Sequence, residues 1–159
     1  MVSSGRAAVA MTEAETLDFL GSQRKLQVAT LGRDGAPHLT TLFFVVDDLG
    51  RLAFWTYASS QKVRNLERDP RATLQVETGT EYQELRGVMF ETDVVIHRDV
   101  DDVLAVGMEV FQRYTPGLDG ELADEVVAMV RKQAEKRVAF QFVERRRASW
   151  DHRKLGGVY

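Results

Sequence analysis

The sequence of 159 residues contains no cysteine. This absence excludes disulfide bonds, thiolate metal sites and cysteine nucleophiles, and it is typical of the cytoplasmic location that we predict. No apolar stretch approaches the ~20 residues that a membrane-spanning helix needs, so we expect no membrane-embedded segment. Two nucleotide-binding motifs are also missing. No GxGxxG follows an expected strand and no GxxxxGK[ST] is present, which argues against a dinucleotide-binding parallel sheet.

The composition is not basic either. The formal net charge is −3, which argues against nucleic acid as a general partner. Hydrophobic residues make up 44% of the chain, enough for a packed core, and the length favours one domain. Residues 1–10 lack the apolar centre of a signal peptide. We therefore predict a disordered N-terminal end there, followed by a single domain over residues 11–159.

Positive charge is concentrated near the end of the chain. Residues 137–154 contain six basic residues against only two acidic ones, Glu144 and Asp151. Two interpretations stay open. The segment is either a solvated strand end or a basic rim for an anionic ligand.

The secondary-structure signals indicate short strands joined by hairpin turns. A capping-box pattern at residues 12–15 (TEAE) predicts a helix over residues 13–20. Alternation predicts strands over 26–31, 36–46, 51–57, 71–77, 85–97 and 137–144, a bulge at Gly87 and an irregular tail after 144. Helical spacing and breakers predict helices over 60–68, 99–114 and 119–135. This order predicts an α+β protein, an antiparallel barrel decorated by helices.

The connection between the third strand and its helix has the layout of an anion site. A strand ending in Thr56 and Tyr57 leads into a serine cap, and Lys62 lies in the first helical turn. The first N–H groups of a helix lack internal partners, and a lysine there adds a cation suited to phosphate. We predict that this segment holds the phosphate of a flavin-like cofactor. Asn65 lies one turn after Gln61, and it either contacts the phosphate or holds the helix to the barrel.

Several motifs in this order resemble a known family. They are residues 28–31 (VATL), 35–38 (GAPH), 60–62 (SQK), 68–71 (RDPR) and 85–88 (LRGV). From about residue 11 to 156, the chain resembles the flavin/deazaflavin oxidoreductases that have the split β-barrel of pyridoxamine 5′-phosphate oxidase. Residues 147–156 (RASWDHRKLG) are similar to an actinobacterial branch assigned to the deazaflavin coenzyme F420.

The resemblance implies a split β-barrel, a homodimer with cofactor sites at the subunit interface, and a small-molecule substrate. It implies a cofactor ring against residues 37–41 and 55–57, and a tail that reaches the partner's site. The cofactor-binding residues predicted from both arguments are His38, Thr40, Thr41, Thr56, Tyr57, Ser60, Gln61, Lys62, Asn65, Trp150 and Arg153.

The sequence also departs from the family's namesake. The helix begins with Gln61 and Lys62 in place of an Arg-Lys pair, and residues 38–42 (HLTTL) lack the basic residues that grip FMN there. Vitamin B6 oxidation is therefore disfavoured, and a loosely held, exchangeable cofactor is favoured. We expect an oxidoreductase that uses reduced coenzyme F420 to transfer hydride to a small electron-poor organic substrate. The alternatives are an FMN-dependent oxidoreductase and a non-catalytic carrier of the coenzyme.

No amino-acid side chain is identified as catalytic. In flavin-like chemistry the cofactor carries the hydride, so the lack of a recognisable triad or carboxylate pair agrees with a redox role. His97 has no other ligand residues at metal-binding spacing, and we predict no metal site.

Overall fold

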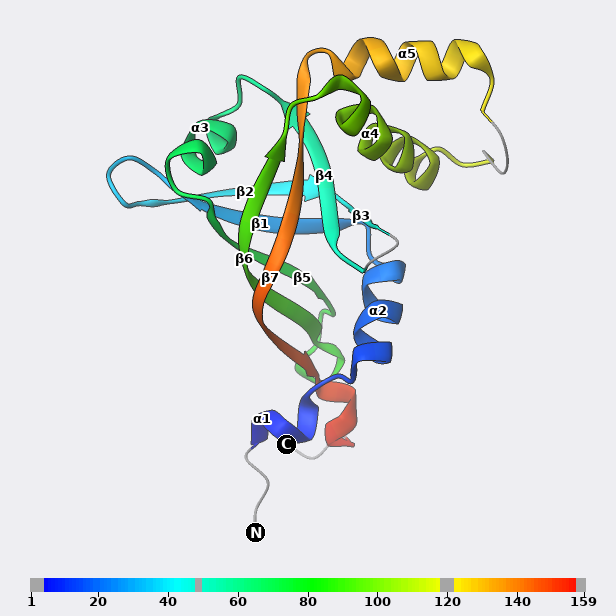
Figure 1. The fold of residues 1–159 in the computed structure, drawn as a ribbon. Coiled ribbons are helices and arrows are strands. Elements are labelled where there is room, and N and C mark those ends of the chain that lie inside the picture. The colour runs from blue at the N-terminus through cyan, green and yellow to red at the C-terminus, as the bar shows by residue number, and fades with distance from the viewer. Residues whose placement is uncertain (1–4, 48–49, 118–121, 157–159) are drawn as a thin grey trace.

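The computed structural model describes residues 5–47, 50–117 and 122–156. They form an α+β domain around one curled, antiparallel seven-stranded sheet with the order β2-β1-β5-β6-β7-β4-β3 (Figure 1). The strands are β1 (Lys25–Leu31), β2 (Pro37–Phe43), β3 (Val45–Val46), β4 (Leu52–Tyr57), β5 (Arg71–Thr78), β6 (Arg86–His97) and β7 (Arg137–Asp151). The predicted fold class, an antiparallel split barrel with helices, is confirmed.

In the described ranges, five α-helices and two short 3-10 turns lie around the sheet. They are α1 (Gly5–Val9), α2 (Glu13–Ser22), α3 (Gln61–Arg68), α4 (Val100–Tyr114), α5 (Asp124–Ala134), η1 (Tyr82–Glu84) and η2 (His152–Leu155). Helix α2 begins with the predicted capping box, in which the Thr12 hydroxyl accepts from the Glu15 N–H and the Glu15 carboxylate accepts from the Thr12 N–H. No helix in the described ranges is long and apolar enough to cross a membrane.

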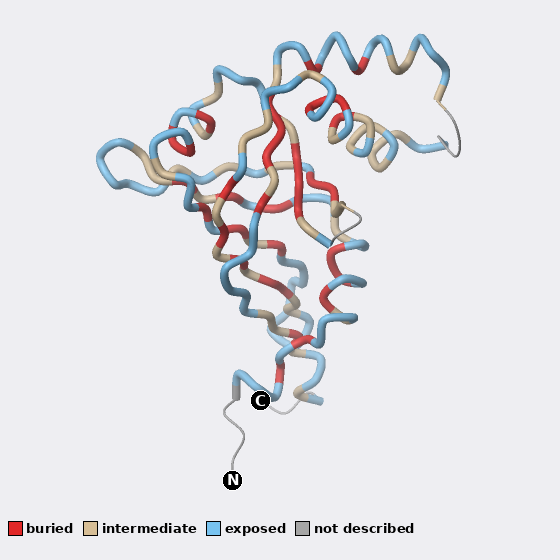
Figure 2. Tube along the Cα trace, viewed as in Figure 1, coloured by how far each residue is buried: buried red, intermediate tan, exposed pale blue. Residues whose placement is uncertain are grey.

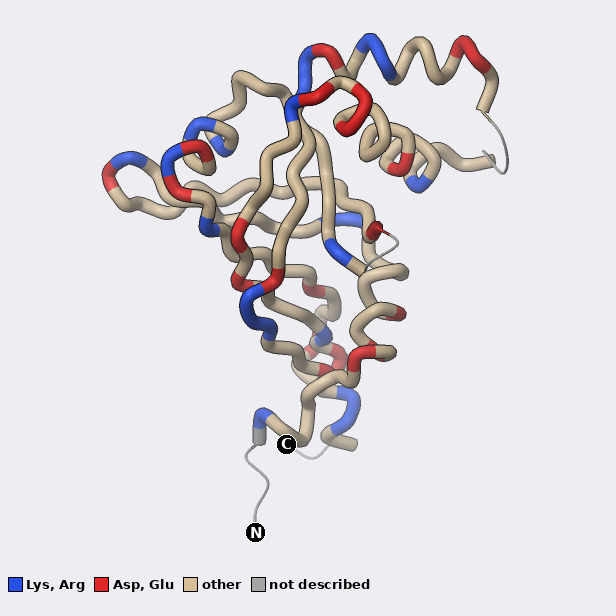
Figure 3. The backbone as a smooth tube through the Cα atoms, in the orientation of Figure 1, with Lys and Arg blue, Asp and Glu red and all other residues tan. Residues whose placement is uncertain are grey.

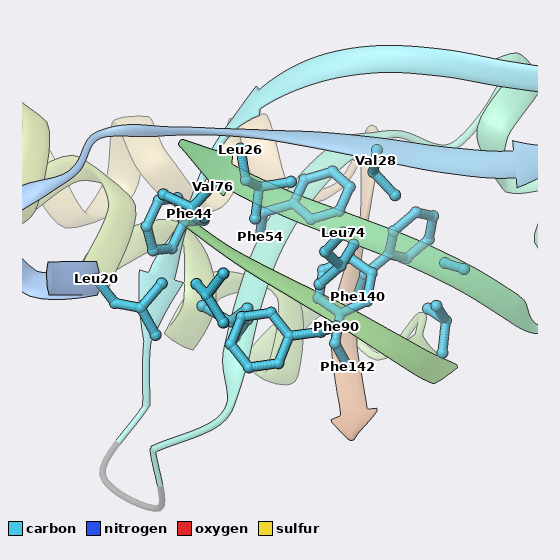
Figure 4. Packing of buried hydrophobic residues seen from close by; sticks show 14 of the residues in the cluster. Leu20, Leu26, Val28, Phe44, Phe54, Leu74, Val76, Phe90, Phe140 and Phe142 are labelled. Carbon is cyan, nitrogen blue, oxygen red and sulfur yellow. The ribbon is translucent and has the colours of Figure 1, made fainter. Parts of the chain in front are cut away.

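The main core fills the inside of the curled sheet. Buried positions alternate along the strands (Figure 2), as expected for strands with one face turned inward. Figure 4 shows the aromatic centre, where the Phe54 ring lies edge-on to Phe140 at 4.9 Å and stacks with Phe142 at 5.6 Å. A second cluster lies between the α4–α5 pair and the outer side of β4 and β7, where Trp55 packs against Gly107.

The sheet closes at Phe44. The sequence predicts one strand over 36–46, but the structure breaks it into β2 and β3 with Phe44 between them. Strand β2 lies at one edge of the sheet, and β3 pairs with β4 at the other edge. Phe44 is thus the corner at which the two edges of the barrel meet, and its side chain is fully buried in the core.

The predicted irregular tail is wrong, because β7 continues to Asp151 along β6. Alternating hydrophobicity stops at Glu144, but backbone pairing continues with exposed ion pairs across the strands, such as Arg146 with Glu91 at 2.6 Å. The register shifts between Glu91 and Thr92, and Gly87 is regularly paired with Trp150, so the predicted bulge at Gly87 is wrong. Glycine is needed there because a Cβ would lie 2.2 Å from the Trp150 ring.

The N-terminal segment is partly ordered. Residues 1–4 lie outside the described ranges, whereas residues 5–9, predicted to be disordered, form α1. The Met11 N–H donates to the Ser149 hydroxyl at 3.0 Å, and the Lys154 ammonium donates to the Ala10 carbonyl at 2.7 Å. These long-range bonds to the end of the chain hold the segment in place, and nothing in its local sequence signals them.

Candidate functional site

The connection from β4 to α3 places a serine hydroxyl at the start of the helix. Ser60 occupies the N-cap position, as predicted, but its side chain makes no capping hydrogen bond. Its Oγ is buried and has no partner among the described residues. The first N–H groups of α3 are also free of helical carbonyl partners, as in any helix. Ser60 therefore offers a hydroxyl and a helix N-terminus to a ligand instead of closing the helix itself.

Lys62 adds a cation to the same turn. Its side chain is half-buried, and this burial lowers the pKa of its ammonium from the ordinary value. No acidic residue in the described part of the chain forms an ion pair with it. A partly desolvated ammonium without a counter-charge is stabilised when an anion binds beside it.

Asn65 holds α3 to the barrel. It is fully buried, and its Nδ2 donates to the Thr30 Oγ1 of β1 at 3.0 Å. Its Oδ1 accepts from the Gln61 Nε2 at 2.9 Å. Of the two roles left open for Asn65, the structure supports that of holding the helix, and Gln61 is directed to Asn65.

Strand β2 contributes two more buried polar atoms. His38 pairs with Thr30 and Thr40 pairs with Val28, so both side chains lie on the inner face of the sheet. The His38 Nδ1 and the Thr40 Oγ1 are buried without a hydrogen-bond partner in the described residues. Since Thr30 also bonds Asn65, the His38 side of β2 lies close to α3. Thr41 lies on the opposite, exposed face and does not join this group.

At the end of β4, Thr56 and Tyr57 also lie on opposite faces of the sheet. Thr56 is buried on the inner face, whereas Tyr57 is 54% exposed on the outer face. The Arg137 guanidinium lies 4.3 Å from the centre of the Tyr57 ring and 4.5 Å from that of Trp55. This stack fixes the strand end that leads into Ser60, whose N–H donates to the Tyr57 carbonyl at 3.0 Å.

The two predicted tail residues lie elsewhere in the chain. The Trp150 ring covers Gly87, and Arg153 forms a bidentate pair with Asp151 at 2.9 and 2.7 Å. Figure 1 shows α3 and the C-terminal end of β7 at opposite ends of the sheet. One chain does not bring Trp150 and Arg153 to α3, and their approach to a partner's site stays a prediction.

Most of the basic residues near the end of the chain form ion pairs within it. Figure 3 shows acidic positions close to these basic ones along the chain. Arg145 pairs with Asp93, Arg146 with Glu91, Arg147 with Glu144, Arg153 with Asp151, and Lys154 with Glu15. These contacts match a solvated strand end with cross-strand ion pairs better than a basic rim for a ligand.

Four cations without a described carboxylate partner lie beside the β4–α3 connection. They are Lys62, Arg64, Lys136 and Arg137. The Lys136 carbonyl accepts from the Ala58 N–H at 3.1 Å, which places the start of β7 against this connection. The sequence signal for Lys136 was its position beside Arg137, just before a predicted strand, but only the sheet pairing reveals its neighbour.

The turn after α3 is stabilised by an ion pair between Asp69 and Arg71. Arg71 donates to the Asp69 carboxylate at 2.9 and 2.6 Å, and this contact lowers the pKa of Asp69 to about 2. Arg71 and Asp69 thus form a salt bridge that stabilises the turn. In the ranges that the structure describes, no group of three or more His, Asp or Glu residues is arranged to hold a metal ion.

Comparisons with known proteins agree with this architecture. Residues 12–150 match the family model described as pyridoxamine 5′-phosphate oxidase. The solved structure of the conserved hypothetical protein Rv2991 from Mycobacterium tuberculosis is 43% identical, with 99% of this chain and 95% of that chain covered and a TM-score of 0.88. No curated protein matches the chain by sequence.

Two more distant structures share the fold. An F420 reductase is 21% identical over 82% of this chain and 94% of its own, with a TM-score of 0.61. The heme storage protein HutZ from Vibrio cholerae is 18% identical over 84% of this chain and 90% of its own, with a TM-score of 0.64. At these identities the likeness concerns the fold alone.

Proposed function

Because the chain belongs to the pyridoxamine 5′-phosphate oxidase family, we propose that it is an oxidoreductase that binds a phosphate-bearing deazaflavin or flavin. Its proposed reaction is hydride transfer from reduced coenzyme F420 to a small electron-poor organic substrate. One observation carries this proposal. Among the described residues, Ser60 at the start of α3 has a buried hydroxyl without a hydrogen-bond partner, two residues before a Lys62 that forms no ion pair, and His38 and Thr40 have further unpartnered polar atoms on the inner face of β2.

The residues present fit such a coenzyme. Lys62, the Ser60 hydroxyl and the first amides of α3 would hold the phosphate. Thr40, Thr56 and His38 offer hydrogen bonds along the inner walls between β2 and β4. When bound, the reduced coenzyme supplies the hydride, and the chain supplies orientation and a site with little water.

The charges around α3 favour coenzyme F420 over FMN. In the part of the chain that the structure describes, Lys62 is the one cation placed here to bind the phosphate, and residues 38–42 add no further lysine or arginine. This low positive charge favours a coenzyme that exchanges readily over one that stays bound. Coenzyme F420 also carries an anionic polyglutamate extension, which FMN lacks. The cations placed to receive it are Arg64, Lys136 and Arg137, since those of residues 145–147 are already paired.

We also propose that the protein is a homodimer. The outer face of the sheet at β2 exposes Leu39 at 65% and Phe43 at 53%. A groove of about 400 Å³ on the sheet reaches from Pro37 to Arg145. A second copy of the chain would cover these apolar residues and bring its own Trp150 and Arg153 towards a coenzyme. Sedimentation equilibrium should give twice the mass of the chain, and a monomer would contradict this proposal.

The test of the proposed function is a titration with coenzyme F420 and with FMN, followed by tryptophan fluorescence. Trp55 lies on the strand that leads into Ser60, so binding at α3 should quench it. We expect saturable quenching by coenzyme F420 and weaker binding of FMN. The reverse preference would indicate an FMN enzyme, and tight binding without turnover in a substrate screen would indicate a carrier. If neither coenzyme changes the tryptophan fluorescence, the result would contradict a coenzyme site.

A double substitution tests the cations assigned to the polyglutamate extension. Arg64→Gln combined with Lys136→Gln is expected to weaken coenzyme F420 binding about tenfold at low salt, since each exposed cation contributes up to about 1 kcal/mol. Raising the salt concentration should reduce the difference. FMN affinity should stay unchanged in the same variant. The matched control is Arg145→Gln with Arg146→Gln, and an equal loss in that control would refute the assignment.

A further inference from the structure

The two walls of the proposed site are joined at one corner of the sheet. His38 and Thr40 lie on β2, and Thr56 lies on β4. In the described sheet β2 is an edge strand that pairs with β1, and it makes no ladder with β4. The chain passes from the edge formed by β2 to the opposite edge, formed by β3 and β4, at Phe44. Phe44 is therefore the point at which the chain directly connects the two walls.

A single side chain satisfies the backbone at this corner. The Phe44 N–H donates to the Tyr114 hydroxyl at 3.1 Å, and the Phe44 carbonyl lies 2.6 Å from the same hydroxyl. The Arg24 carbonyl, just before β1, lies 2.8 Å from it. The hydroxyl has one proton, which it donates to one of these two carbonyls while it accepts from the N–H.

The last turn of α4 braces the corner from a second direction. The Arg113 guanidinium lies 5.0 Å from the centre of the Phe44 ring. It donates to the carbonyls of Leu20 at 3.0 Å and Gln23 at 2.7 Å, at the end of α2. Figure 4 shows Phe44 in the core with Leu20 and Leu26 nearby. Helix α4 thus connects α2, the start of β1 and the corner.

A shift at the corner reaches the site through β2 and its partner strand β1. A strand rises about 3.3 Å per residue, so His38 lies roughly 20 Å along β2 from Phe44. Strand β2 is paired with β1 from Pro37 to Phe43, and Tyr114 also contacts the Arg24 carbonyl just before β1, so a shift at the corner acts on both strands of this hairpin.

We infer that Tyr114 is a positioning residue for the coenzyme site. Its hydroxyl holds the corner at Phe44, and through it the spacing between the β2 wall and the wall formed by β4 and α3. This inference rests on the proposed function for its effect on a coenzyme, but the effect on β2 itself is independent of any coenzyme.

The test compares Tyr114→Phe with Ser149→Ala. Each variant loses one hydroxyl bonded to the backbone, but Ser149 bonds Met11 near the far end of β7. We expect Tyr114→Phe to raise the Kd for coenzyme F420 about tenfold, measured well below the melting temperature, and Ser149→Ala to leave it unchanged. If both variants lose thermal stability but keep the wild-type Kd, Tyr114 has a structural role only and the inference is overturned.

Hydrogen exchange of the coenzyme-free protein supplies a second readout. Amides of residues 37–46 should exchange several-fold faster in Tyr114→Phe than in the wild type, and at the wild-type rate in Ser149→Ala. Unchanged exchange in Tyr114→Phe would overturn the inference. If the wild type binds neither coenzyme, the proposed function fails, and the exchange rates alone decide whether Tyr114 positions β2.

Discussion

Lys62→Ala is expected to raise the Kd for the coenzyme by about 30- to 100-fold, because it removes the cation that we propose meets the coenzyme phosphate. A hydrogen bond between charged groups contributes about 2–3 kcal/mol, and each 1.4 kcal/mol is a factor of ten in affinity. Lys62 lies in the first turn of α3, where the helix N-terminus also favours an anion. Fluorescence titration of the variant and the wild type measures the change.

Stability separates this effect from unfolding. The Lys62 ammonium is half-buried and has no described acidic partner, so its loss should not lower the melting temperature. Lys25→Ala, at the exposed start of β1, is the matched control and should leave the Kd unchanged. Normal affinity in Lys62→Ala, or an equal loss in Lys25→Ala, would refute the phosphate assignment.

The same residue predicts a pH dependence. Burial lowers the pKa of Lys62 from the ordinary value of 10.5. The charged form binds phosphate, so affinity should be full below this lowered pKa and fall as the pH rises through it. The fall should therefore occur at a lower pH than an ordinary lysine would give, and it should be absent in Lys62→Ala.

Asp151→Asn is expected to destabilise the fold by about 2–3 kcal/mol, since breaking a buried ion pair leaves a charge without a partner. Asp151 is only 4% exposed. It accepts from the Arg153 guanidinium at 2.9 and 2.7 Å, and it lies 3.1 Å from the Arg86 Nε. Arg86 in turn lies 5.0 Å from the centre of the Phe19 ring of α2. The carboxylate thus joins β6, β7, η2 and α2.

Chemical and thermal unfolding measure this prediction. A loss of that size lowers the melting temperature by about 5–10 °C in a domain of this length. Asp69→Asn is the matched control, because Asp69 also forms a bidentate pair with an arginine but lies at an exposed turn. Its melting temperature should change little, because surface pairs contribute little to stability. Equal melting temperatures for Asp151→Asn and the wild type would contradict a structural role for Asp151.

Acid unfolding gives an independent check. Hydrogen bonding to Arg153 lowers the pKa of Asp151. A carboxyl whose pKa is lower when folded contributes stability above its unfolded pKa of about 3.9, and this is lost as the pH falls through the folded pKa. The difference in the free energy of unfolding between the wild type and Asp151→Asn should therefore disappear as the pH falls below about 4. Comparing the two proteins removes the contribution of Asp69, which titrates in the same range and is common to both.

Local sequence patterns predict the features that depend on near neighbours, that is, on residues a few positions apart in the sequence. These features are the capping box at Thr12, the ends of most helices and strands, and the position of Lys62 in the first turn of α3. The salt bridge of Asp69 with Arg71 is local as well. The antiparallel split barrel followed from hairpin-linked strands and from motifs in a known order.

Features that depend on distant partners become visible only in the folded chain. Strand β7 extends to Asp151 because β6 supplies hydrogen bonds and opposite charges, where the alternating pattern has already stopped. Asn65 holds α3 through Thr30, which lies 35 positions away in the sequence. Phe44 breaks a strand because Tyr114, 70 positions later, satisfies its backbone. These groups come together only when the chain folds. The contacts are stabilised by burial and by pairing between distant residues, so a local sequence pattern cannot predict them.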